Sequence, residues 1–141
     1  LDLFPMYSGG DPLAAAHRYT ELLSAQFPNR NLPTFDITLL GMGEDGHTAS
    51  LFPGMVSPDL IEKTCVAVYA GEQHGWRISL TSGIFNRSEN ILILAAGRSK
   101  GRLIRQILEK SKFSEQLPIS WIKPVTGSLT WLVDTAAGSQ I

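Results

Sequence analysis

Asp45 and His47 are the side chains of this sequence best suited to acid–base chemistry, because one residue separates them in a glycine-rich loop. Gly41, Gly43 and Gly46 allow the backbone of this loop to turn tightly and to approach a ligand closely. An imidazole has an unperturbed pKa of about 6.5, which suits a general base near neutral pH. A nearby carboxylate can orient the imidazole and stabilise its protonated form. The loop therefore predicts a pocket in which both side chains face a substrate.

The loop follows an apolar run, residues 37–40, that is typical of a buried strand. In an open parallel sheet, ligands bind beyond the carboxyl ends of the strands, which is where this loop would lie. The glycines also match the G-x-G-x-x-G pattern of dinucleotide-binding folds. That pattern requires a full crossover helix directly afterwards, whereas a helix here could run only from about His47 to Phe52 before Pro53 ends it. Nicotinamide or flavin binding is therefore disfavoured.

Other catalytic chemistries have little support in the sequence. No serine stands in a G-x-S-x-G motif. Cys65 lies in an apolar run, as a small core residue would, and is a poor candidate for a nucleophile. The histidines lack the spacing of metal ligands; His17 is given no role, and His74 is expected to face solvent. We therefore expect direct attack of water, without a metal and without a cofactor.

The bulk composition of the chain limits its function classes. A formal net charge of −1 and a pI of about 6.3 provide no electrostatic basis for binding nucleic acid. No apolar run approaches the roughly 20 residues needed to cross a membrane, and no signal peptide is visible. The single cysteine cannot form an internal disulfide, so the cytoplasm is the expected compartment. A length of 141 residues suits one domain, residues 1–141.

Predicted strands and helices alternate along the chain, which indicates an α/β class with a mostly parallel sheet. The run 91–96 is continuously apolar and is expected to be a central strand covered on both faces. The other expected strands are 36–40, 64–70, 76–81, 118–122 and 129–133; the expected helices are 12–27, 99–110 and a last one beginning at Thr135, with a short helical or loop connection at 82–87.

Residues 41–54, GMGEDGHTASLFPG, resemble the signature of the 6-phosphogluconolactonases. The related glucosamine-6-phosphate deaminases have a similar G-x-G-x-DGH loop but continue with Asn-Glu-Pro where this chain has residues 50–53, Ser-Leu-Phe-Pro. The resemblance is therefore to the lactonase branch. It implies that His47 is the general base and that Asp45 supports it. The plain alternative is that Asp45 caps the turn and His47 is a packed loop residue.

The resemblance also implies four substrate-binding residues. Arg77 opens an Arg-Ile-Ser-Leu stretch, and Lys100 closes a G-x-x-K element, at positions that would contact the substrate phosphate in related sites. Lys100 would lie at the start of a helix, where the helix dipole and free N–H groups favour an anion. Gly41 and Gly43 would let the backbone approach the sugar. The alternatives are a surface charge for Arg77, a solvated helix residue for Lys100, and simple turn geometry for the glycines.

The same resemblance implies a three-layer α/β/α fold and covers nearly the whole chain, as the C-terminal part of the lactonase domain. Lactonases carry a further N-terminal region with a Ser/Gly-rich phosphate loop. Residues 8–12 imitate that loop superficially, but no apolar strand precedes them, so they are interpreted as the turn into the first helix. We therefore expect the N-terminal part of the fold to be missing. An unpaired sheet edge would then favour self-association.

The function implied by the resemblance is hydrolysis of 6-phospho-D-glucono-1,5-lactone to 6-phosphogluconate, in the oxidative pentose phosphate pathway. The expected partner is thus a sugar-phosphate lactone, with no nucleic acid and no membrane. Two alternatives stay open: a deaminase or isomerase acting on glucosamine 6-phosphate, and a truncated fragment that binds sugar phosphates without turnover.

Overall fold

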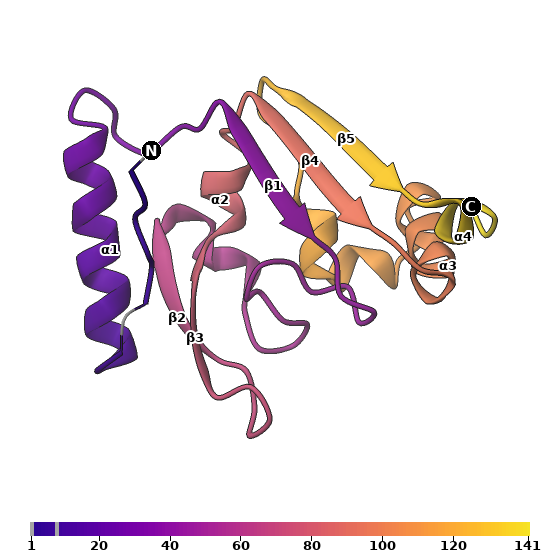
Figure 1. The fold of residues 1–141 in the computed structure, drawn as a ribbon, viewed down its shortest axis with the longest axis horizontal. Helices are drawn as coiled ribbons and strands as arrows, with labels where there is room; N and C mark the ends of the chain where they lie inside the picture. The colour runs from indigo at the N-terminus through magenta and orange to yellow at the C-terminus, as the bar shows by residue number, and fades with distance from the viewer. Residues whose placement is uncertain (1, 8) are drawn as a thin grey trace.

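Three parallel strands form the central sheet of the chain (Figure 1). They are β1 (Ile37–Gly41), β4 (Asn90–Ala95) and β5 (Ser128–Val133), in the order β1-β4-β5. The register places Leu39 beside Leu92 and Leu92 beside Thr130. This computed structural model describes residues 2–7 and 9–141; Ser8, which was expected to begin the turn into the first helix, lies outside them. The predicted α/β class with a parallel sheet is confirmed.

A separate antiparallel hairpin stands between the sheet and the first helix (Figure 1). Its strands are β2 (Cys65–Tyr69) and β3 (Trp76–Leu80), and α1 (Pro12–Gln26) packs against them. The side chain of Asp11 caps α1 by accepting a hydrogen bond from the Ala14 N–H at 2.7 Å. Both strands occur where the sequence predicts them, but they do not join the parallel sheet.

One face of the parallel sheet is covered. Ile91 and Ile93 of β4 are fully buried in one core with Ile104 of the third helix and Ala137 of the fourth. The remaining elements are α2 (Ser82–Phe85), α3 (Arg98–Leu108), α4 (Thr135–Gly138) and the 3₁₀ helices Pro58–Glu62, Ser114–Gln116 and Pro118–Trp121. The last helix begins at Thr135, as predicted, and Asp134 caps it by accepting a hydrogen bond from the Ala137 N–H. No helix in the described part of the chain is long and apolar enough to cross a membrane.

Two expectations about this region are wrong. The prediction that β4 is covered on both faces fails, because alternate side chains leave Leu94 48% exposed, and its neighbours on the same face include the 66% exposed Leu39. The strand predicted at 118–122 is a 3₁₀ helix. Pro118 has a fixed φ and no N–H to donate, so it suits the first position of a helical turn and not a central strand.

Candidate functional site

The loop 41–54 follows the carboxyl end of β1. In open parallel sheets, ligands bind beyond the carboxyl ends of the strands, so this loop lies where a ligand is expected. Its centre holds the Asp45–His47 pair. The His47 Nδ1 lies 2.6 Å from the Asp45 Oδ1, and the His47 backbone N–H donates to the same oxygen at 3.0 Å. The side chain of His47 is 34% exposed and that of Asp45 is 53% exposed, so the pair lies at the surface of the site. The structure therefore brings together the two residues predicted to do acid–base chemistry.

The orientation of this pair determines what His47 can do. When Nδ1 carries the proton and donates it to the carboxylate, Nε2 keeps its lone pair and is free to accept a proton. Partial burial raises the pKa of Asp45, but hydrogen bonds from the His47 backbone and side chain lower it more, so the pKa lies below its ordinary value. Asp45 is therefore ionised at neutral pH and can stabilise a protonated His47.

Gly43 makes room for this pair. A Cβ built on Gly43 would lie 2.7 Å from the Asp45 Oδ1 and closer still to the His47 ring. Gly46 has a φ of +83°, which favours glycine, and a Cβ there would lie 3.0 Å from Leu117. At Gly41, by contrast, a Cβ would meet no described atom within 4 Å. Steric fit thus explains Gly43 and Gly46, and the approach of Gly41 and Gly43 to a substrate stays a prediction.

Hydrogen bonds hold the loop from several sides. The buried Thr48 hydroxyl donates to the Gly41 carbonyl at 2.8 Å, and the Ser50 N–H donates to the Ser79 hydroxyl of β3 at 3.2 Å. The Ile119 N–H donates to the Gly46 carbonyl at 3.1 Å. The loop is therefore tied to the end of β1, to the hairpin and to the 3₁₀ helix that replaces a predicted strand.

The short helix considered for residues 47–52 is not formed. Thr48 and Leu51 instead pair in both directions through their backbone groups, and Ala49 has a φ of +51°, which a right-handed helix does not allow. The helix required for dinucleotide binding is thus missing from this loop.

A cavity of about 540 Å³ separates the loop from the turn of the hairpin, residues 70–75. The loop contributes Glu44, Asp45, His47, Phe52 and Met55, and the turn contributes residues 70–74. The Phe52 ring lies 4.6 Å from the His47 ring and 5.8 Å from the His74 ring, centroid to centroid. His74 is exposed, as predicted, but it also lines the cavity. The sequence contains no signal for this, because His74 reaches the cavity through the folding of the hairpin.

The two basic residues expected to bind phosphate do not line this cavity. Lys100 lies in the first turn of α3, next to Ser99, whose hydroxyl donates to Glu44 of the loop at 2.6 Å. The charge of Lys100 contributes to lowering the pKa of Asp134, after the larger effect of hydrogen bonds from the Ala137 and Gly97 N–H groups. Arg77 is exposed on β3, paired with Val68. The start of α3 is therefore hydrogen-bonded to the loop, whereas Arg77 lies on a strand of the hairpin.

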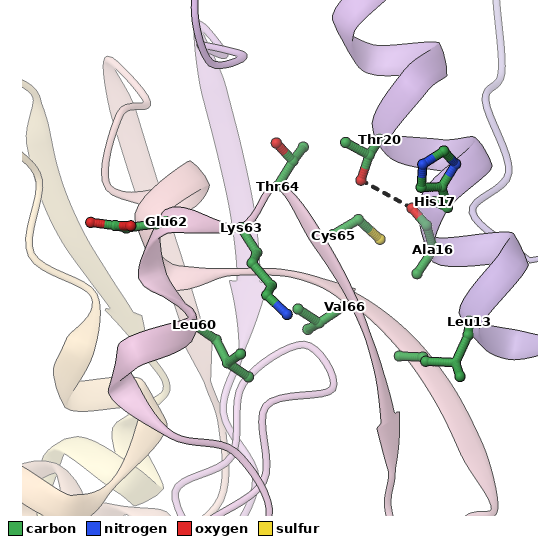
Figure 2. A pocket seen from close by; sticks show the side chains of 11 residues that line it. Leu13, Ala16, His17, Thr20, Leu60, Glu62, Lys63, Thr64, Cys65 and Val66 are labelled. Atoms are coloured by element: carbon green, nitrogen blue, oxygen red, sulfur yellow. Dashed lines mark hydrogen bonds between the residues drawn. The ribbon is translucent and has the colours of Figure 1, made fainter.

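Another hollow, of about 500 Å³, lies between α1, β2 and the Pro58–Glu62 helix (Figure 2). Figure 2 shows Cys65 on β2 with its sulfur directed toward α1. Burial raises the pKa of the Cys65 thiol to about 11. His17 is on the same side of α1, where its Nδ1 lies 3.6 Å from a Glu21 carboxylate oxygen. Because a thiolate is the reactive form, this hollow does not provide a nucleophile at neutral pH.

Comparisons with known proteins match both the sequence and the fold of this chain. The chain is 35% identical over 126 residues to the 6-phosphogluconolactonase of Rattus norvegicus, covering 87% of this chain and 48% of the relative. A crystal structure described as devB protein superposes with a TM-score of 0.82 at 32% identity, covering 94% of this chain and 56% of the other. A structure described as a monomeric glucosamine-6-phosphate deaminase superposes with a TM-score of 0.67 at 26% identity, covering 91% and 54%.

The chain thus spans about half the length of the curated relatives it matches. The sequence profile of one family, described as glucosamine-6-phosphate isomerases/6-phosphogluconolactonase, matches residues 2–131. That match includes β1, the loop with Asp45 and His47, the hairpin and most of β5. The chain belongs to the family of glucosamine-6-phosphate isomerases and 6-phosphogluconolactonases.

Proposed function

We propose that this chain carries the general base of an enzyme that hydrolyses 6-phospho-D-glucono-1,5-lactone to 6-phosphogluconate. The observation that carries the proposal is the His47–Asp45 pair, with the His47 Nδ1 2.6 Å from the carboxylate oxygen and both side chains lining a cavity. The names of relatives that match this chain support the choice of substrate. A reaction of this kind belongs to the oxidative pentose phosphate pathway.

The reaction is acyl transfer to water. His47 Nε2 accepts a proton from a water molecule as its oxygen attacks the lactone carbonyl carbon, and Asp45 stabilises the imidazolium that forms. The tetrahedral intermediate then breaks the bond between the carbonyl carbon and the ring oxygen, and His47 returns the proton to that oxygen. The product is an open-chain carboxylic acid with a new hydroxyl group. The acid then ionises to the carboxylate.

We assign the phosphate of the substrate to the two basic residues Lys100 and Arg77. Lys100 at the start of α3 offers a positive charge together with the free N–H groups of the helix end. Arg77 could hold phosphate oxygens with two parallel hydrogen bonds. Gly41 and Gly43 would let the loop backbone come close to the sugar. His47 would remain the residue that transfers the proton, and Asp45 would remain the carboxylate that stabilises it.

The test is a coupled assay for 6-phosphogluconate with freshly made lactone. His47→Ala should reduce the enzymatic rate to the uncatalysed one while the melting temperature stays near that of the unchanged protein. His17→Ala is the matched control, because His17 is exposed on α1 and belongs to the other hollow. Turnover by His47→Ala at the normal rate would overturn the assignment of the base.

Two alternatives have their own readouts. The family includes deaminases, and one superposes on this chain at 26% identity, so release of ammonia from glucosamine 6-phosphate is measured in parallel. Ammonia release without lactone hydrolysis would favour the deaminase. Binding of sugar phosphates without either reaction would favour a non-catalytic fragment, and the intact mass of the purified protein shows whether the assay used these 141 residues alone.

A further inference from the structure

His74 is held in a defined place by the turn that joins β2 and β3. The Ala70 N–H donates to the Gly75 carbonyl at 2.9 Å, and the N–H groups of His74 and Gly75 both donate to the Gly71 carbonyl. Gly71 and Gly75 have φ values of +80° and +62°, which glycine adopts without strain. The turn therefore fixes the backbone of His74 opposite the loop that carries Asp45 and His47.

The side chain of His74 is placed by Phe52. The two rings are nearly parallel, with 17° between their planes and 5.8 Å between their centroids. Phe52 is itself partly buried against the core, so it offers a fixed support. Because Phe52 also contacts the His47 ring at 4.6 Å, one anchored phenyl ring supports both imidazoles at the edge of the same cavity.

The remaining charges of the cavity indicate which part of a substrate His74 would meet. Glu44, Asp45 and Glu72 all line it, so a phosphate dianion would meet three carboxylates there. A polyhydroxylated sugar chain requires hydrogen-bond donors and acceptors instead. A neutral imidazole has one of each. This cavity therefore suits the hydroxyl groups of a sugar lactone, with its phosphate directed toward Lys100.

We propose that His74 is a substrate-positioning residue, which hydrogen-bonds the hydroxyl groups of the sugar lactone from the hairpin side of the cavity while His47 acts from the loop side. This inference rests on the proposed function of the site, which it extends with a second imidazole. His74 takes no part in proton transfer. Its effect is to hold the lactone carbonyl where the water activated by His47 can reach it.

The test measures binding of 6-phosphogluconate by calorimetry and hydrolysis of the lactone by the coupled assay, on the unchanged protein and on three variants. One neutral hydrogen bond corresponds to a factor of about 3 to 10. His74→Ala should therefore weaken binding and raise KM by that factor, with kcat changed less. His74→Gln, which retains a donor and an acceptor, should restore most of the loss. His17→Ala should match the unchanged protein.

Each outcome separates this inference from the proposed function. Binding that weakens in His74→Ala, in a protein without turnover, would support the inference and refute hydrolysis. Turnover in the unchanged protein, with unchanged binding and KM in His74→Ala, would refute the inference alone. No binding of 6-phosphogluconate and no turnover of the lactone by the unchanged protein would refute both. Failure of His74→Gln to restore binding, together with a lowered melting temperature in both variants, would reduce His74 to a structural role and overturn the inference.

Discussion

Replacing Gly43 by alanine should disable His47 without unfolding the protein. The φ of Gly43 lies outside the left-handed region, so the backbone accepts alanine. The new Cβ would nevertheless lie 2.7 Å from the Asp45 Oδ1, where ordinary contacts begin at 3.4 Å, so this oxygen must retreat by at least about 0.7 Å. The His47 ring, which is closer to that Cβ, must retreat further.

The magnitude follows from this displacement. Misplacing a reacting group by about 1 Å can reduce a rate about a hundredfold. We therefore expect kcat for lactone hydrolysis to fall between about tenfold and a hundredfold in Gly43→Ala. The stability loss should be limited to about 0.5–2.5 kcal/mol, because the displaced hydrogen bond to the ionised Asp45 is worth about 1.5–3 kcal/mol and a Gly→Ala change at a compatible backbone returns about 0.4–1 kcal/mol.

Gly138→Ala in α4 is the matched control, since Gly138 lies outside the candidate site and a Cβ there would meet the Val133 side chain at an ordinary 3.9 Å. The assays are the rate of lactone hydrolysis, the melting temperature, and the NMR signal of the His47 Nδ1 proton, which reports the hydrogen bond to Asp45 whatever the reaction is. The steric explanation is refuted if Gly43→Ala retains both the normal kcat and the normal His47 signal, or if Gly138→Ala loses activity equally.

Three further predictions concern other parts of the molecule. Lys100→Ala should raise KM for the lactone about tenfold or more, as expected for one hydrogen bond to a charged group, whereas Arg105→Ala at the other end of α3 should not; an unchanged KM would remove Lys100 from the phosphate site. Asp134→Ala should lower the melting temperature at pH 7, because backbone hydrogen bonds to the Asp134 carboxylate lower the pKa of this group in the folded protein. The stabilisation is complete above about pH 3.9, the pKa of an unfolded Asp, and is lost as the pH falls through the lower pKa of the folded state. The difference in melting temperature from the unchanged protein should therefore shrink in acid. Cys65, with a pKa of about 11, should react with a thiol reagent at pH 8 at least about a hundredfold more slowly than glutathione, and rapid labelling would contradict its burial.

Local patterns in the sequence were sufficient to predict most elements. The first helix, the β1 run and the start of the last helix at Thr135 each depend on residues close in the chain, and the structure has all of them. The predictions failed where distant residues decide. Burial of β4 on its second face requires a partner layer, and the described residues cover one face.

The contacts of the candidate site also divide into those between residues close in the sequence, which could be predicted, and those between distant residues, which could not. Asp45 and His47 are two positions apart, so their pairing could be predicted from the loop itself. His74 reaches the cavity because the hairpin folds back over the loop, and its neighbour Phe52 is 22 positions away in the sequence. No local pattern records such a contact. The steric role of Gly43 depends on where the His47 ring lies, and the sequence alone does not provide that position.

The candidate site is assembled by two sheets that share no strand. The parallel sheet carries the loop with His47, and the hairpin carries His74. One direct link between them is the bond from the Ser50 N–H to the Ser79 hydroxyl, which is almost completely buried. Because Phe52 touches both imidazoles, a shift of the hairpin relative to the loop would change the distance between them. The width of the cavity therefore depends on how firmly the hairpin is held against the loop.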